Sequence, residues 1–143
     1  MQSIERTVGV DRPLAAVWAF LSDFESTNDW DPGTVRTVRT SGDGGPGTVY
    51  SNTSRFAGRR TTLDYTVLDR EDERLLRLRG VNKGSTVVET MTFAGDAARS
   101  SVTYRLELTL RGAARLAAPA MPLVLRKLGD DGERGLREAL ERL

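Results

Sequence analysis

The chain has 143 residues, with 21 Lys and Arg against 20 Asp and Glu, so its formal net charge is +1, and it contains no histidine and no cysteine. The lack of both residues excludes a disulfide framework, a thiolate nucleophile, an imidazole base and the usual ligands of zinc and haem. The near-neutral charge argues against a nucleic-acid binder, and the length suits one domain over residues 1–143. Any chemistry must come from carboxylate, Arg, Tyr, hydroxyl and amide groups, and we expect neither a metal nor a cofactor.

The first 33 residues predict a strand followed by one or two short helices. Residues 4–10 alternate as a strand with Ile4, Val8 and Val10 on one face. Five apolar residues then recur at helical spacing between Leu14 and Phe24. A short helical or irregular stretch reaches Trp30 and ends at residues 31–33, Asp-Pro-Gly, because Pro and Gly stop a helix.

Between residues 35 and 111 the pattern changes to about six short alternating runs separated by turns. The longest run, residues 100–110, alternates over its whole length. Its apolar face carries Val102, Tyr104, Leu106, Leu108 and Leu110. Such alternation predicts an antiparallel sheet with one face in water and one face in the core.

The last segment, residues 113–143, has the composition of a helix, and its strongly helical part is expected to begin near Pro122. A sheet with one apolar face can bury that face against one amphipathic helix. The chain is therefore predicted to be an α+β protein in which a curved antiparallel sheet of about seven strands wraps around a long C-terminal helix.

Several local phrases resemble the START-like superfamily, also called SRPBCC or the birch-pollen-allergen fold, in its polyketide cyclase/dehydrase branch. They are residues 10–18 (VDRPLAAVW), 22–24 (SDF), 30–32 (WDP), 47–49 (GTV) and 63–67 (LDYTV), together with the apolar last helix. The resemblance implies a helix-grip fold with a cavity between the sheet and the last helix. In that family the cavity takes lipids, sterols, polyketides, quinones and other apolar molecules. No single catalytic motif comes with the resemblance, so no catalytic residue is carried over.

The hairpin around residues 57–58 decides which side chains would line such a cavity. If Ala57-Gly58 is a two-residue turn, Tyr50 lies opposite Tyr65 and Asn52 lies opposite Leu63. Tyr50, Asn52 and Tyr65 then share the inner face and are candidate ligand-binding residues. A loop one residue longer would turn one strand over and void that set.

Glu89 is the most informative residue of the predicted inner face, because it shares that face with Val87, Met91 and Phe93. A carboxylate among apolar side chains needs a partner, a raised pKa or water. Two structural interpretations are open: an internal ion pair with Arg6 or another Arg, and an opposite register in which Val88 points inward. The functional interpretation is an orienting group or a general acid/base, which makes Glu89 the best catalytic candidate if the protein is an enzyme.

Four further residues complete the candidate set. Tyr104 and Met91 lie on the predicted inner face, although a core tyrosine and a gap-filling methionine are the structural alternatives. Trp30 is expected at the cavity mouth. Gly132, one of three glycines spaced by three in the last helix, either leaves room for a ligand or reflects compositional drift or a local kink.

The leading functional prediction is the binding of a small apolar or amphipathic molecule (polyketide, lipid or isoprenoid-like) in the cavity. The alternative is a polyketide cyclase, aromatase or dehydratase acting there, and a third possibility is a module whose surface binds a protein. Titratable groups converging inside would favour the enzyme, and an apolar lining the carrier. We expect a cytoplasmic monomer or homodimer without membrane insertion, because no apolar run is long enough to span a bilayer and no secretion signal is present.

Overall fold

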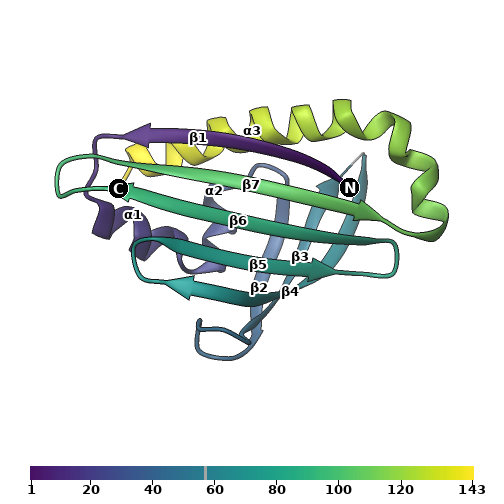
Figure 1. The fold of residues 1–143 in the computed structure, drawn as a ribbon, viewed down its shortest axis with the longest axis horizontal. Helices are drawn as coiled ribbons and strands as arrows, with labels where there is room; N and C mark the ends of the chain where they lie inside the picture. The colour runs from purple at the N-terminus through teal and green to yellow at the C-terminus, as the bar shows by residue number, and fades with distance from the viewer. Residues whose placement is uncertain (57) are drawn as a thin grey trace.

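The computed structural model describes residues 1–56 and 58–143 (Figure 1). Within these residues, seven strands, three α-helices and two 3-10 helices follow one another along the chain: β1 (Gln2–Val10), α1 (Leu14–Leu21), η1 (Phe24–Ser26), α2 (Thr27–Trp30), β2 (Thr34–Ser41), β3 (Val49–Phe56), β4 (Arg59–Glu71), β5 (Leu75–Val81), β6 (Ser85–Gly95), β7 (Ser100–Leu110), η2 (Gly112–Ala120) and α3 (Met121–Glu141). The predicted order of elements is confirmed.

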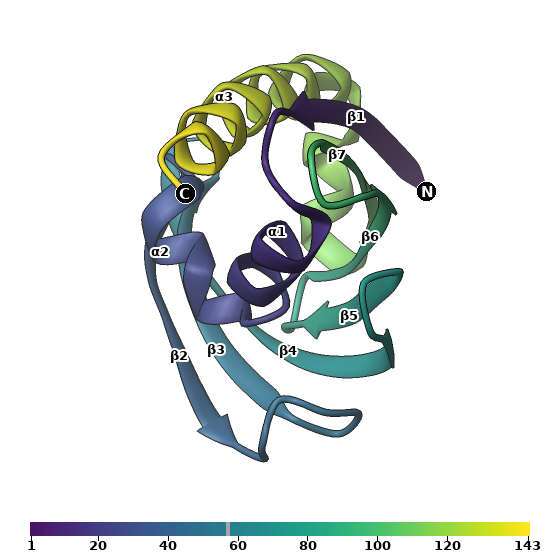
Figure 2. The ribbon, with the colours of Figure 1, turned by 90° about the vertical axis from the view of Figure 1, so that its left-hand side faces the viewer.

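All seven strands form one antiparallel sheet in the order β1-β7-β6-β5-β4-β3-β2. The sheet curls, and α3 lies along its open side beside β1 (Figure 2). Apolar side chains of α3, among them Leu125, Leu136 and Leu140, are buried against it. This arrangement is the helix-grip fold, so the predicted fold class is confirmed.

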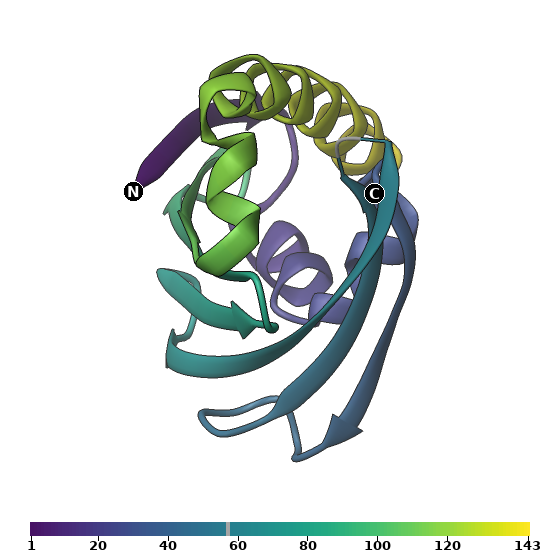
Figure 3. The ribbon, with the colours of Figure 1, turned by 90° about the vertical axis from the view of Figure 1, so that its right-hand side faces the viewer.

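Short helical segments lie at both ends of the sheet. At one end α1 and α2 fit inside the curl (Figure 2). At the other end η2 leads from β7 into α3, near the β3–β4 hairpin (Figure 3). Within the described chain, no helix is both long and apolar enough to cross a membrane.

The β3–β4 register agrees with the prediction from a two-residue turn. Phe56 pairs with Arg59, and Tyr50 pairs with Tyr65. Ala57, the first residue of the predicted turn, lies outside the described residues. The pairing puts Asn52 and Tyr65 on the inner face, where both are buried.

The three glycines of α3 permit close packing of the helix, which corrects the expectation that Gly132 leaves room for a ligand. A Cβ on Gly132 would lie 3.0 Å from the Tyr104 hydroxyl, and one on Gly129 would lie 2.7 Å from Cδ1 of Ile4. A Cβ on Gly135 would lie 2.1 Å from the carbonyl oxygen of Trp30. The helix continues through all three positions, and a side chain at any of them would meet other atoms, so the glycines leave no free space beneath it.

Replacing Gly135 with Ala should therefore destabilise the fold, because the added methyl group meets backbone that cannot move alone. We expect a loss of about 2 kcal/mol in the free energy of unfolding, measured with urea. Gly129→Ala is the matched control, since the end of the Ile4 side chain can rotate away and alanine favours helix by ~1 kcal/mol. Equal effects of the two substitutions would contradict this account of helix packing.

Candidate functional site

An internal cavity of about 70 Å³ lies between the inner face of the sheet, α2 and α3. Its apolar lining comes from both layers: Phe24, Trp30, Phe56, Leu63, Val87, Leu106, Leu108 and Leu128. Its polar lining consists of Thr27, Asp31, Asn52, Ser54, Thr61, Tyr65, Ser85, Glu89 and Tyr104. A buried water needs roughly 10–15 Å³, so the cavity has room for a few water molecules or for one end of a larger ligand.

Glu89 projects into this cavity from β6, as its alternation with Val87 and Met91 predicted. Both structural interpretations of this residue are wrong. Arg6 donates to Asp130 at 2.9 Å and lies 3.4 Å from Glu133, both on α3, and Glu89 forms no ion pair with any described residue. The register also turns Glu89, and not Val88, toward the cavity.

Burial raises the pKa of Glu89 to about 8. The nearby carboxylate of Asp31 adds to the rise, because two negative charges in one cavity repel each other. A hydrogen bond with the Tyr65 side chain opposes the rise without cancelling it. Glu89 is therefore mostly protonated at neutral pH. A small change in its surroundings is enough to change its protonation state at physiological pH.

Tyr65 reaches Glu89 across the intervening strand because of a glycine. Tyr65 pairs with Gly80 of β5, and a Cβ on Gly80 would lie 2.6 Å from the tyrosine ring. The ring therefore lies over β5 in space that any other residue would fill. Its burial and the adjacent carboxylates raise the pKa of Tyr65 well above its usual value, so the phenol stays protonated and can donate a hydrogen bond.

Asp31 is a second cavity carboxylate that the sequence analysis missed as a functional group. It follows α2, and its side chain accepts hydrogen bonds from the backbone N–H of Gly33 at 3.0 Å and the hydroxyl of Thr34 at 2.9 Å. Burial nevertheless raises its pKa. The segment Asp31-Pro32-Gly33 signalled the helix end, but nothing in it indicated that this turn covers the cavity.

The remaining candidates divide between the cavity lining and the surrounding core. Tyr104, Trp30 and Asn52 line the cavity. Tyr104 and Trp30 pack edge to face with ring centroids 6.0 Å apart. The side-chain amide of Asn52 donates to the hydroxyl of Thr37 at 2.7 Å.

Tyr50, Met91 and Gly132 do not line the cavity, which corrects their sequence-based placement. The Tyr50 ring packs against Phe24, with ring centroids 5.6 Å apart, and only 1% of the residue is exposed. Met91 is buried in the core beyond Glu89. Tyr104 lines the cavity and Gly132 does not, and a Cβ on Gly132 would lie 3.0 Å from the Tyr104 hydroxyl.

A groove of about 300 Å³, the side groove, adjoins the cavity. Four residues line both spaces: Asp31, Gly33, Phe56 and Leu128. These four residues therefore form a wall that the cavity and the side groove share. Lys127 lines the side groove but not the cavity.

The sequence matches one protein family from residue 1 to residue 141, and that family is described as polyketide cyclase/dehydrase and lipid transport. This chain belongs to the polyketide cyclase/dehydrase and lipid transport family. The resemblance found in the sequence is thereby confirmed. A search of curated proteins gives no match.

Solved structures similar to this member of the family share its fold at low sequence identity. The ZhuI aromatase/cyclase from Streptomyces sp. R1128 is 18% identical, with a TM-score of 0.84 over 99% of this chain and 94% of that chain. A START superfamily protein from Mycobacterium smegmatis is 12% identical, with a TM-score of 0.75 over 98% of this chain and 97% of that chain. Norcoclaurine synthase from Thalictrum flavum, solved with dopamine and hydroxybenzaldehyde, is 14% identical, with a TM-score of 0.68 over 99% of this chain and 87% of that chain.

The raised pKa of Glu89 makes stability depend on pH. The folded state holds a proton that the unfolded state releases above about pH 4.5, so the free energy of unfolding falls by up to ~1.4 kcal/mol per pH unit as pH rises toward about 8. Glu89→Gln removes this dependence. The variant should gain stability over the parent protein as the pH rises from about 5 to 8. Urea unfolding at several pH values would contradict the assignment if the difference stayed constant.

The hydrogen bond from Tyr65 can be tested separately. Tyr65→Phe should raise the pKa of Glu89 further, because the variant loses a donor that favours the ionised carboxylate. Tyr104→Phe is the matched control, since the Tyr104 hydroxyl is not among the groups that shift the pKa of Glu89. The measurement is ¹³C NMR titration of the Glu89 carboxyl carbon, and equal pKa values in Tyr65→Phe and the parent would overturn the pairing.

Proposed function

We propose that the protein binds a small amphipathic molecule bearing a carbonyl group and that Glu89 moves a proton at the carbon next to that carbonyl. The observation that carries this proposal is the convergence of Glu89, Tyr65 and Asp31 on one mostly apolar cavity. A purely apolar lining would favour a carrier, and this lining holds two carboxyl groups. The family and the aromatase/cyclase fold likeness support a polyketide-like ligand.

The geometry supports a balanced acid–base cycle. Ionised Glu89 accepts the proton from the carbon, and the C–H electron pair becomes an enolate whose oxygen accepts a hydrogen bond from Tyr65. The enolate forms a C–C bond with a second carbonyl of the same ligand. The alkoxide produced there takes the proton back from Glu89, so the carboxylate is regenerated without any other reactant.

Asp31 contributes to this cycle through its charge. Its carboxylate raises the pKa of Glu89 and so makes Glu89 a stronger base once it is ionised. The hydrogen bonds from Gly33 and Thr34 hold Asp31 in place. Since only the ionised form of Glu89 accepts a proton, the rate should rise with pH up to about 8.

A carrier of the same class of ligand is the second candidate. It is favoured by the many apolar residues of the lining and by the protonation of Glu89 at neutral pH, which removes a buried charge and provides a hydrogen-bond donor for a ligand oxygen.

Glu89→Gln distinguishes the two candidates. The bicyclic ketone 2-tetralone serves as the probe, and ¹H NMR in D₂O measures the exchange of its α-hydrogens. The parent protein should accelerate exchange, and Glu89→Gln should lose about 100-fold or more of that acceleration, since positioned acid–base groups contribute 10²–10⁴-fold. Binding, followed by quenching of tryptophan fluorescence, should persist in the variant because the amide keeps a donor.

The other outcomes are equally informative. Binding without accelerated exchange in the parent protein would contradict the catalytic proposal and support the carrier. Acceleration that survives in Glu89→Gln would show that another group moves the proton. Absence of ketone binding to the parent protein would count against both candidates.

A further inference from the structure

The charge of this chain is unevenly distributed, although its total is close to zero. Residues 55–60, 82–84 and 112–128 hold seven Lys and Arg and no Asp or Glu. The rest of the chain holds 14 basic and 20 acidic residues. The three segments are the β3–β4 hairpin, the β5–β6 turn, and η2 with the first turns of α3, and they meet at one end of the molecule (Figures 1 and 3).

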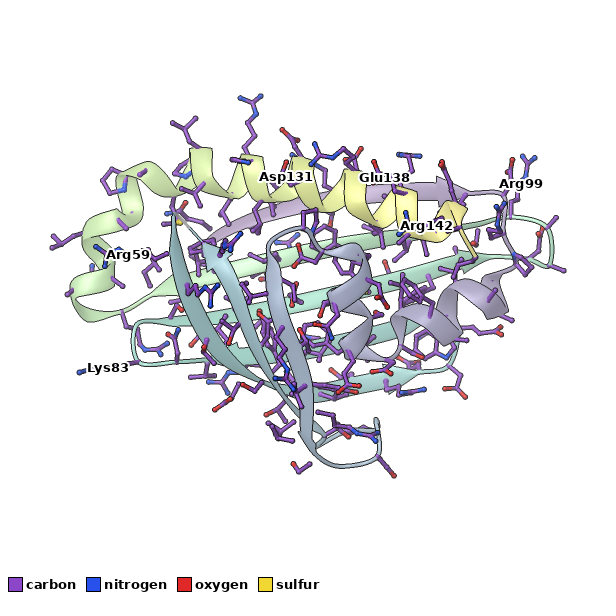
Figure 4. All side chains as sticks on the ribbon, turned by 180° about the vertical axis from the view of Figure 1, so that it is seen from behind. Arg59, Lys83, Arg99, Asp131, Glu138 and Arg142 are labelled. Atoms are coloured by element: carbon purple, nitrogen blue, oxygen red, sulfur yellow. The ribbon has the colours of Figure 1, made fainter. Side chains whose placement is uncertain are left out.

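The basic side chains of this end are exposed, and most of them have no acidic partner among the described residues. Six of them, which together form the basic end, make no ion pair within residues 1–56 and 58–143: Arg55, Arg59, Arg60, Lys83, Arg115 and Arg126. Only Lys127 has an acidic partner, Asp131 at 2.8 Å. Figure 4 shows Arg59 and Lys83 at this end and Arg99 and Arg142 at the opposite one. Arg99 there lies 3.7 Å from Asp11.

Two large apolar side chains stand among these cations. Leu116 of η2 is 86% exposed and Leu123 of α3 is 73% exposed. Both side chains remain in water in the folded chain, and contact with an apolar surface would be favourable for them. Leu116 also lines a groove of about 750 Å³, the end groove, together with Arg59 and Lys83.

The basic end lies next to the cavity. Phe56 lines the cavity, the side groove and the end groove. Thr61 and Ser85 line both the cavity and the end groove. Whatever covers the basic end therefore stands next to the cavity.

We propose that the basic end docks on the surface of an anionic lipid bilayer, with Leu116 and Leu123 in contact with the interfacial region. Cations attract anionic headgroups, and exposed leucines among them gain by leaving water for the acyl boundary. An acidic protein would match the cations, but it would need a shaped apolar recess for each leucine, whereas a bilayer accepts protruding leucines as they stand. The protein lies on the membrane without spanning it, and the docking is independent of the acid–base chemistry proposed for Glu89.

Sedimentation with phosphatidylcholine vesicles, prepared with and without phosphatidylglycerol, tests the proposal on the whole protein. The parent should bind the anionic vesicles, bind the neutral vesicles weakly, and lose affinity as salt is added. Lys83→Gln with Arg115→Gln should lower affinity about 25-fold, because each cation near an anionic surface contributes about fivefold. The matched control, Arg99→Gln with Arg142→Gln, removes two cations from the opposite end and should bind as the parent does.

Leu116→Ser with Leu123→Ser should lower affinity for the anionic vesicles by about 10-fold or more, since two exposed apolar contacts are lost. Leu143→Ser is its control, and thermal unfolding confirms that each variant is folded. Failure of the parent to bind anionic vesicles would overturn the proposal, as would equal binding by the Lys83/Arg115 variant and its control. Tight binding of an acidic protein or of RNA in the absence of vesicle binding would assign the surface to that partner instead.

Discussion

A carboxyl group on the apolar inner face of a sheet is the constraint on which the site depends. Alternation along β6 puts Glu89 on the inner face with Val87 and Met91, and Glu89 lines the cavity there. Among the described residues no cation forms an ion pair with it. Arg6 lies on the inner face of β1, yet its guanidinium turns to the acidic residues of α3. The cavity therefore accommodates Glu89 largely as the neutral acid, hydrogen-bonded with Tyr65 and close to Asp31.

The fold provides this environment through small residues at specific contacts. Gly80 gives the Tyr65 ring the space to cross β5, and Gly132 and Gly135 let α3 approach Tyr104 and the end of α2. These contacts bring the helix layer down on the sheet and keep the cavity small. An aromatase/cyclase and a synthase have the same fold at low sequence identity to this chain. The functional proposal therefore depends on the residues that line the cavity rather than on the fold.

The sequence was sufficient for the features that depend on local periodicity. The presence of two residues between Phe56 and Arg59 in the sequence was enough to predict the β3–β4 register, and strand alternation was enough to predict that Glu89 points inward. Features that depend on how separate elements pack could not be predicted in this way. Asp31 enters the site because α2 ends over the cavity, while Tyr50 is excluded from it because Phe24 of η1 covers its ring. The grouping of the basic segments at one end of the molecule likewise becomes visible only when the topology is known, because the segments are distant from one another along the chain.

The protonation of Glu89 at neutral pH links its burial to the chemistry proposed for it. Infrared difference spectroscopy of the parent protein against Glu89→Gln at neutral pH observes this state directly, without a ligand. We expect the difference to contain the C=O stretch of a protonated carboxylic acid, diminishing as the pH rises through about 8. A difference that contains only the paired stretches of an ionised carboxylate at neutral pH would contradict the central claim.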